Sequence, residues 1–206
     1  MALRIGIDFD NTIVGYDQAF VSLAIDLELI QAGSVSTKTQ LRSALRARTG
    51  GEQDWQRLQG RIYGAEMERA EMISGVGDFL QCVRKCEDEV FIISHKTEFG
   101  HYDPDRVNLR DAARDWMEVQ GFFSLERYAI EAENVFFLST REEKVDQISA
   151  LNLDWFIDDL PEVLSANGFP ESVRKILFTN GADSSEANVP YIIKRCWNDI
   201  QDEIYP

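Results

Sequence analysis

The sequence predicts an α/β protein with a doubly wound parallel sheet and a small all-helical insert. Three observations lead to this fold class. Short, nearly continuous apolar runs recur along the chain, helical patterns separate most of them, and one long stretch near the N-terminus contains no such run. Continuous apolar runs are typical of strands that are buried on both faces, and their alternation with helices indicates parallel crossover connections.

The apolar runs are the expected strands of the sheet, and they are rich in β-branched and aromatic residues. They cover residues 3–9, 90–94, 134–138, 154–157 and 175–179. Apolar residues at helical spacing predict helices over residues 77–86, 108–120 and 142–151, and a packed terminal helix in the tail, 191–206.

No convincing strand interrupts the stretch from about Val14 to Ile73, where apolar stripes at helical spacing predict two or three helices. We therefore expect a core domain of residues 1–14 and 74–206 and a helical insert of residues 15–73. The insert could act as a lid over the mouth of the sheet, or it could be a packed decoration without that role.

The composition limits the partners of the chain. Its 206 residues carry a net charge of −15, which argues against nucleic acid or an anionic membrane as a partner. A small phosphorylated substrate remains compatible with this charge, because a bound cation reverses the local field. There is no apolar signal core, no run approaching the roughly 18 apolar residues of a membrane span, and no disulfide-like cysteine spacing. We expect a cytoplasmic protein, and the sequence gives no indication of its oligomeric state.

Polar residues that can carry chemistry stand at the ends of the expected strands. Asp8 and Asp10 follow the first strand, Ser94 ends the second, and Asp158 and Asp159 follow a later one. A parallel sheet brings these ends to one edge, where ligand sites form. Because four neighbouring carboxylates repel one another, the pattern predicts a bound Mg²⁺, which prefers oxygen ligands.

One lysine has an unusual place in the pattern. The segment from Ser139 to Lys144 is typical of a helix start, with Ser139 or Thr140 as the N-cap and a glutamate three residues later as a capping box. A lysine in this first turn opposes the helix dipole. Lys144 is either a solvated lysine that tolerates this cost or, as we expect, a cation that meets a phosphate and the aspartates.

In this order, the motifs resemble those of the haloacid dehalogenase (HAD) superfamily of phosphotransferases. The first motif, Asp-x-Asp-x-Thr, matches residues 8–12, the second matches Ser94, the third Lys144 and the fourth the acidic pair 158–159. The sequence departs from the first motif at Asn11, where many members have Gly, and Asn tolerates unusual backbone angles. The helical insert resembles the C1 caps of small-molecule phosphatases. The first motif and the acidic pair are similar to those of 5′-deoxynucleotidases.

The resemblance implies a HAD-like Rossmannoid core and a role for each motif residue. It implies that Asp8 is the nucleophile that forms an aspartyl phosphate, and that Asp10 is the general acid and base. It also implies a Mg²⁺ site in which Asp8, the backbone carbonyl of Asp10 and Asp159 are ligands, while Asp158 lies just outside. Ser94 and Lys144 would bind the phosphate and offset its charge.

Residues that could select a substrate lie near these motifs. Thr12 would orient Asp10 or its loop, or would be an ordinary turn hydroxyl, and we include it with its neighbour Asn11 among the substrate-binding candidates. His95 and Lys96 begin a polar segment, 95–106, directly after Ser94. Lys96 or Arg106 could bind an anionic substrate group, or the segment could be a solvated loop with His95 bonded to the backbone.

The function expected from the sequence is that of a Mg²⁺-dependent phosphatase for a small phosphorylated metabolite, such as a sugar phosphate or a nucleotide. Three alternatives remain. The chain could transfer the phosphoryl group to an acceptor other than water, or it could be a non-catalytic module that binds metal and phosphate. A dehalogenase would not need Asp10 or Asp159, so these residues argue against that activity.

Overall fold

The computed structural model describes residues 2–102, 105–182 and 189–206, and the chain divides into two compact units. The first unit comprises Met1–Ile13, Met72–Lys96 and Gly121–Pro206, and the second comprises Val14–Glu71 and Thr97–Gln120. The insert expected over residues 15–73 therefore falls mostly in the second unit, which also contains the later segment 97–120.

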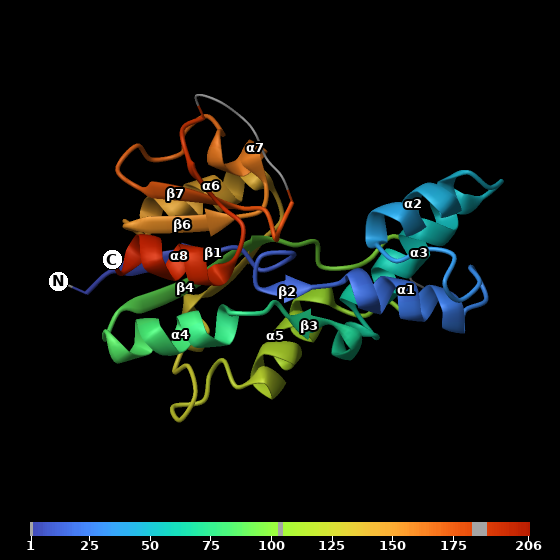
Figure 1. The fold of residues 1–206 in the computed structure, drawn as a ribbon, viewed down its shortest axis with the longest axis horizontal. Helices are drawn as coiled ribbons and strands as arrows, with labels where there is room; N and C mark the ends of the chain where they lie inside the picture. The colour runs from blue at the N-terminus through green and yellow to red at the C-terminus, as the bar shows by residue number, and fades with distance from the viewer. Residues whose placement is uncertain (1, 103–104, 183–188) are drawn as a thin grey trace. The chain divides into compact units, whose positions relative to one another are not determined.

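The first unit is built on a six-stranded sheet with the strand order β5-β4-β1-β6-β7-β8 (Figure 1). Every neighbouring pair in this order is parallel, so the predicted α/β class and parallel sheet are confirmed. The strands are β1 Arg4–Ile7, β4 Glu89–His95, β5 Val135–Leu138, β6 Trp155–Asp158, β7 Arg174–Phe178 and β8 Ile192–Lys194.

Helices cover both faces of this sheet, because successive side chains of each strand point to opposite faces. The helices of this unit are α4 Val76–Lys85, the 3₁₀ helix Ala132–Asn134 (η2), α6 Arg141–Ala150, α7 Pro161–Leu164 and α8 Trp197–Ile204. On one face, Phe91 and Leu177 join a buried cluster with residues of α6 and α7. On the other face, Trp197 of α8 contacts Phe178 of β7 and Phe79 of α4, with ring centroids 5.7 and 5.0 Å apart.

Two expectations about strands were wrong. The tail was expected to be one helix, yet Ile192–Lys194 is the edge strand β8, with Ile192 opposite Ile176 in β7, and α8 begins only at Trp197. The β-branched Ile192 and Ile193 suit a strand, but the apolar spacing from Ile193 through Trp197 to Ile204 also fits a helix. The insert was expected to contain no strand, yet Val14–Gly15 (β2) pairs with Glu71–Met72 (β3) in a small sheet.

The first of the two segments that leave the first unit begins and ends at residues that are hydrogen-bonded to each other. Ile73 donates its backbone N–H to the carbonyl of Ile13, with an N···O distance of 2.9 Å. The short β2–β3 pair continues from this hydrogen bond. The two ends of the excursion between residues 13 and 73 are thus fixed to each other.

Helices make up most of the second unit. Its helices are α1 Asp17–Asp26, α2 Lys38–Arg46, α3 Gly51–Tyr63, the 3₁₀ helix Met67–Arg69 (η1) and α5 Leu109–Gln120. Phe20 stacks on Trp55 at 5.0 Å, and Tyr16 meets Tyr63 edge-on at 4.8 Å, which places these aromatic residues in the core of the unit. Among the described residues, none of the helices has the length and apolar character needed to cross a membrane.

Helix α5 was expected to be a crossover helix of the sheet, but it packs with the helices of the second unit. The indole N–H of Trp116 donates to the carbonyl of Ala70 at 3.0 Å. Trp116 and Met117 are buried there. An amphipathic pattern shows that a helix has one apolar face, but it does not identify the element that covers this face.

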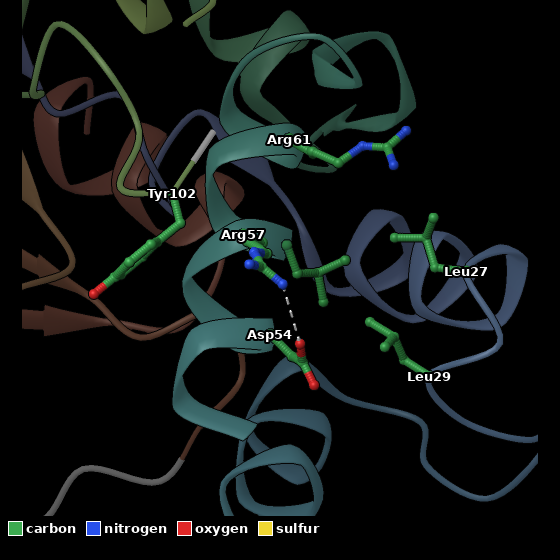
Figure 2. A pocket seen from close by; sticks show the side chains of 7 residues that line it. Leu27, Leu29, Asp54, Arg57, Arg61 and Tyr102 are labelled. Carbon is green, nitrogen blue, oxygen red and sulfur yellow. Dashed lines mark ion pairs between the residues drawn. The ribbon is translucent and has the colours of Figure 1, made fainter. Parts of the chain in front are cut away.

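The second unit also contains a cavity of about 600 Å³ (Figure 2). Its walls are formed by Leu27, Leu29, Asp54, Arg57, Leu58, Arg61 and Tyr102. Arg57 lies 3.9 Å from Asp54, and Arg61 is paired with Glu66 at 2.6 Å. The cavity therefore combines an apolar wall with guanidinium groups that already have acidic partners.

Glu66 should contribute to stability in a pH-dependent way. It accepts hydrogen bonds from Arg69 at 2.7 Å and Arg61 at 2.6 Å. The bond from Arg69 holds the pKa of Glu66 below its ordinary value, although partial burial opposes this shift, and Arg61 adds to it. A lowered pKa means that the stabilisation is present above the ordinary pKa and is lost as the pH falls. Glu66→Gln should therefore lower the free energy of unfolding by about 1–2 kcal/mol at neutral pH, and by less in acid.

Urea denaturation at pH 7 and pH 4 measures this difference. Glu68→Gln is the control, because Glu68 is an exposed acid of the 3₁₀ helix η1, which begins directly after Glu66. A Glu66→Gln effect that is equal at both pH values, or that equals the effect of Glu68→Gln, would contradict the prediction.

Candidate active site

The central strands bring the predicted motif residues to one edge of the sheet. Strand β1 lies between β4 and β6, and Asp8 follows it directly. The N–H of Asp8 donates to the carbonyl of Ile157 at 2.9 Å, which keeps Asp8 beside the end of β6. Ser94 lies near the end of β4, and Asp158 is the last residue of β6. The sheet order thus explains why residues far apart in sequence converge.

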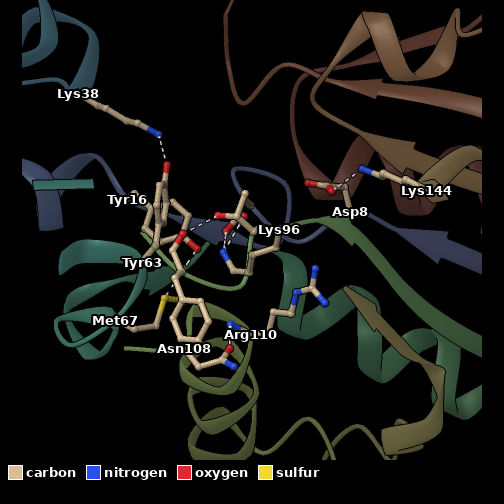
Figure 3. A network of polar contacts seen from close by, with 12 residues as sticks. Asp8, Tyr16, Lys38, Tyr63, Met67, Lys96, Asn108, Arg110 and Lys144 are labelled. Atoms are coloured by element: carbon tan, nitrogen blue, oxygen red, sulfur yellow. Dashed lines mark hydrogen bonds and ion pairs between the residues drawn. The ribbon is translucent and has the colours of Figure 1, made fainter. Parts of the chain in front are cut away.

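Lys144 connects two of the aspartates from helix α6. Its ammonium lies 2.5 Å from Oδ1 of Asp8 (Figure 3). The same ammonium lies 2.6 Å from Oδ2 of Asp158. Lys144 is only 1% exposed although it stands in the first turn of its helix. The helix starts with a capping box formed by Thr140 and Glu143, as expected. The cap satisfies the free N–H groups of the turn, so the lysine can point at the carboxylates without leaving the helix end unpaired.

Asp8, Asp158 and Asp159 form a group that could hold a metal ion. Each offers one carboxylate oxygen, and these oxygens all lie within 4.8 Å of one another. The two oxygens of Asp158 accept hydrogen bonds from Lys144 and from the N–H of Leu160, the latter at 2.8 Å. Asp8 and Asp159 are therefore the better direct ligands of this group, and Asp158 is suited to a supporting position.

The electrostatics of the group favour a cation. Burial raises the pKa of Asp8 to about 7. Attraction to Lys144 lowers this pKa, and repulsion from Asp158 and Asp10 offsets part of that lowering. Burial also raises the pKa of Asp159 to about 8, with repulsion from Asp8 as the next cause. Burial lowers the pKa of Lys144, but attraction by Asp158 and Asp8 outweighs it and raises that pKa above its ordinary value. A divalent cation would relieve this repulsion between the carboxylates.

Two buried hydroxyls point to a bound ligand. Thr12 is fully buried and Ser94 is 1% exposed, and in the described part of the chain neither side-chain oxygen has a hydrogen-bond partner. An unpaired buried hydroxyl costs about 1–3 kcal/mol, so such groups normally have a partner. An anion with several acceptor oxygens, such as phosphate, could supply one to each of them.

Comparison with solved structures gives the same fold over the whole chain. Protein Tyrosine Kinase A of Mycobacterium tuberculosis matches with a TM-score of 0.62 and 14% identity, covering 100% of this chain and 99% of that one. A protein of Clostridium acetobutylicum, described as a predicted phosphatase, matches at 0.59 and 15%, covering 99% and 98%. The HAD hydrolase YfnB of Bacillus subtilis, described as bound to magnesium, matches at 0.59 and 12%, covering 100% and 99%.

The chain has the HAD fold. Most of the similar structures are described as HAD-superfamily hydrolases or phosphatases. No family model matches the sequence, and a search of curated proteins also finds no match. At these identities the likeness concerns the fold, so the chemistry has to be argued from the residues of the site.

The loop after β1 contains one residue in the left-handed conformation. Asn11 adopts a φ of 60°, the left-handed conformation that asparagine tolerates and that Gly adopts freely. The carbonyl of Thr12 accepts a hydrogen bond from the indole N–H of Trp197 at 3.1 Å. Helix α8 thereby fixes the loop that presents Asp8 and Asp10. The sequence pattern contained no signal for this contact, because Trp197 is 185 residues away.

Three residues of the polar segment after Ser94 have contacts within the protein. The ring Nε2 of His95 lies 2.9 Å from the carbonyl of Ser139, which matches the alternative of a backbone-bonded histidine. The ammonium of Lys96 contacts both carboxylate oxygens of Asp10, at 2.9 and 2.8 Å. Arg106 lies over the ring of Phe99 in the second unit, at 4.8 Å, and residues 103–104 lie outside the described part of the chain. A substrate contact by His95, Lys96, Asn11 or Thr12 stays a prediction.

The Lys96–Asp10 pair is the contact at this site that the sequence reasoning missed. Lys96 was considered only as a ligand for the substrate. A signal was present in the spacing, because Ser94 and Lys96 are two residues apart at a strand end, as Asp8 and Asp10 are. Residues two apart in extended chain point to the same side, so both pairs could have been expected to face one edge.

Proposed function

We propose that the protein is a Mg²⁺-dependent phosphatase that hydrolyses a small phosphorylated metabolite, such as a sugar phosphate or a nucleotide, through an aspartyl phosphate. The observation that carries this proposal is the contact of Lys144 with Asp8 beside Asp159, at a sheet edge where two buried hydroxyls have no partner among the described residues. The three free cysteines support a cytoplasmic location for this activity.

In the first step, a carboxylate oxygen of Asp8 forms a bond to phosphorus. The bond between phosphorus and the leaving oxygen breaks, and Asp10 donates a proton to that oxygen. Lys144 holds the attacking carboxylate in place and offsets the negative charge of the phosphoryl group. Ser94 and Thr12 donate their hydroxyl protons to phosphate oxygens, which satisfies both groups.

In the second step, Asp10 takes a proton from water, and the water oxygen bonds to phosphorus. The bond between phosphorus and the oxygen of Asp8 breaks, so that inorganic phosphate leaves and both aspartates return to their starting states. Splitting one difficult displacement into two easier ones is the advantage of a covalent intermediate.

The carboxylates of Asp8 and Asp159 would hold the Mg²⁺ ion, with Asp158 in support and the backbone carbonyl of Asp10 as the further ligand implied by the resemblance. Hard oxygen donors of this kind suit Mg²⁺. The bound ion would supply positive charge for the phosphate oxygens. At this site, the four aspartates outnumber the two lysines, Lys96 and Lys144, so acidic groups predominate and favour a bound cation.

A phosphotransferase is the second candidate. One similar structure is that of a protein named as a tyrosine kinase, so a protein named for phosphoryl transfer also has this fold. The two candidates differ only in the acceptor of the second step. Addition of alcohol acceptors to the assay decides between them, because a transferase forms a new phosphate ester at the expense of inorganic phosphate.

Hydrolysis of an aryl phosphate by the purified chain tests the proposed function. We expect hydrolysis with millimolar Mg²⁺, and a rate at least about 100-fold lower with a chelator in excess, because the phosphate charge is then unmatched. The rate should return when Mg²⁺ is added back. A panel of sugar phosphates and nucleotides under the same conditions then identifies the substrate class.

Asp159→Asn provides the matched variant for the metal. It removes one proposed ligand, so half-maximal activity should require at least about tenfold more Mg²⁺. A wild-type chain without hydrolysis of any ester in the panel, or with hydrolysis that is indifferent to chelation, would overturn the proposal.

A further inference from the structure

Lys96 is a buried cation whose ammonium contacts the carboxylate of Asp10, the proposed general acid and base. Its side chain is 3% exposed, and its Nζ lies 2.9 and 2.8 Å from the two oxygens of Asp10 (Figure 3). The same Nζ lies 5.6 Å from the centre of the Phe9 ring. The ammonium thus occupies an enclosed position between a carboxylate and an aromatic face.

The backbone on both sides of this contact is fixed. The N–H of Lys96 donates to the carbonyl of Leu138 at 2.9 Å, which continues the pairing of β4 with β5 beyond the end of β4. On the other side, the N–H of Ile13 donates to the carbonyl of Phe9 at 3.0 Å and closes the turn that contains Asp10. Two anchored segments therefore determine where the ammonium and the carboxylate meet.

Burial makes this contact specific. Removing an ammonium from water costs several kcal/mol unless a close opposite charge compensates it. As a carboxylate, Asp10 supplies that charge with both oxygens, and rotating it away would leave Lys96 buried without this compensation. When one oxygen carries the proton for the leaving group, the ammonium still contacts the other oxygen and holds the group in the same orientation. The Asp10 side chain itself is 23% exposed and keeps one side accessible.

We propose that Lys96 is a positioning residue, which fixes the orientation in which Asp10 meets the leaving oxygen of the substrate. This inference rests on the proposed function, in which Asp10 donates a proton to that oxygen. It replaces the expectation that Lys96 binds an anionic group of the substrate. Lys96 acts through Asp10 and contributes most where the leaving group needs a proton.

The test compares two aryl phosphates in the Lys96→Met variant. Phenyl phosphate has a poor leaving group that needs a proton, whereas dinitrophenyl phosphate has a good one that does not. The ratio kcat/KM reports the steps up to release of the leaving group. We expect it to fall about 100-fold for phenyl phosphate, since misplacing a catalytic group has this size of effect. For dinitrophenyl phosphate we expect a change of less than about threefold.

Three further variants separate positioning from other roles. In an Asp10→Asn background, Lys96→Met should cause no additional loss, because its effect passes through Asp10. Lys96→Arg keeps a cation and should restore much of the phenyl phosphate activity. Lys175→Met is the control for the loss of a partly buried lysine in the same unit. The ammonium of Lys175 donates to the carbonyl of Leu164, which is not a proposed catalytic group. This control should leave the ratio of the two substrates unchanged.

Equal losses on both substrates would overturn the inference, as would a loss that persists undiminished in the Asp10→Asn background. If Lys96→Met does not fold, Lys96→Gln serves the same comparison, because a neutral amide can hold only part of the carboxylate. An inactive wild-type chain overturns the proposed function itself. Wild-type activity with an unchanged leaving-group dependence in the Lys96 variants overturns this inference alone.

Discussion

Asp8→Asn should reduce kcat for an aryl phosphate by at least about 10³-fold, because an amide oxygen cannot form the covalent intermediate. The fold should survive the change. Asparagine is nearly the same size, and it removes a carboxylate whose pKa is raised by burial and by repulsion from Asp158. The buried ammonium of Lys144 keeps Asp158 as its charged partner at 2.6 Å. We therefore expect a thermal unfolding midpoint equal to or above that of the wild type. Steady-state kinetics and a melting curve on the same preparation measure both effects.

Asp146→Asn is the control for this change. Asp146 is an exposed residue of α6, two positions after Lys144, so its replacement has the same chemistry outside the site. It should retain full activity. Unchanged activity of Asp8→Asn, in a preparation free of contaminating phosphatase, would remove the proposed nucleophile.

Lys144→Met should have the largest effect on stability. The ammonium of Lys144 contacts Asp8 at 2.5 Å and Asp158 at 2.6 Å, and all three side chains are almost completely buried. Removing one partner from a buried ion pair costs about 3–5 kcal/mol, because the remaining charges lose their compensation. We expect a loss of this size in the free energy of unfolding, measured by urea denaturation, together with loss of hydrolysis.

Arg141→Met is the matched control, because Arg141 is exposed at the start of the same helix. It should change stability by less than about 0.5 kcal/mol. Mg²⁺ offers a second readout. The ion should recover part of the stability of Lys144→Met by neutralising the carboxylates. Wild-type stability in Lys144→Met would show that the buried ammonium does not compensate Asp8 and Asp158.

Local patterns predicted the central strands and the ends from which the site is built. Strands β1, β4 and β6 are continuous apolar runs, and a polar residue ends or follows each. The rule that parallel strands share one edge then brings Asp8, Ser94 and Asp158 to the same end of the sheet. The capping box of Thr140 and Glu143 is likewise a short-range signal, and it placed Lys144 correctly at the start of α6.

The features that the sequence did not predict depend on contacts between distant residues. The amphipathic pattern of α5 was recognised, but its partners in the second unit were not, because any apolar surface can cover such a face. Strand β8 needed the edge of β7 to distinguish it from the first turn of a helix. The pairing of Lys96 with Asp10 spans 86 positions, and although the two-residue spacing indicates a shared side for Ser94 and Lys96, it does not identify Asp10 as the partner.

The hydrogen bond between Ile73 and Ile13 has a consequence for how this chain can change. It joins the two ends of the segment 14–72, most of which belongs to the second unit. A short turn from Ile13 to Ile73 could therefore replace this segment. Every described catalytic candidate, from Asp8 to Asp159, belongs to the first unit. Evolution can therefore lengthen, shorten or replace the segment 14–72 while the proposed catalytic residues stay unchanged.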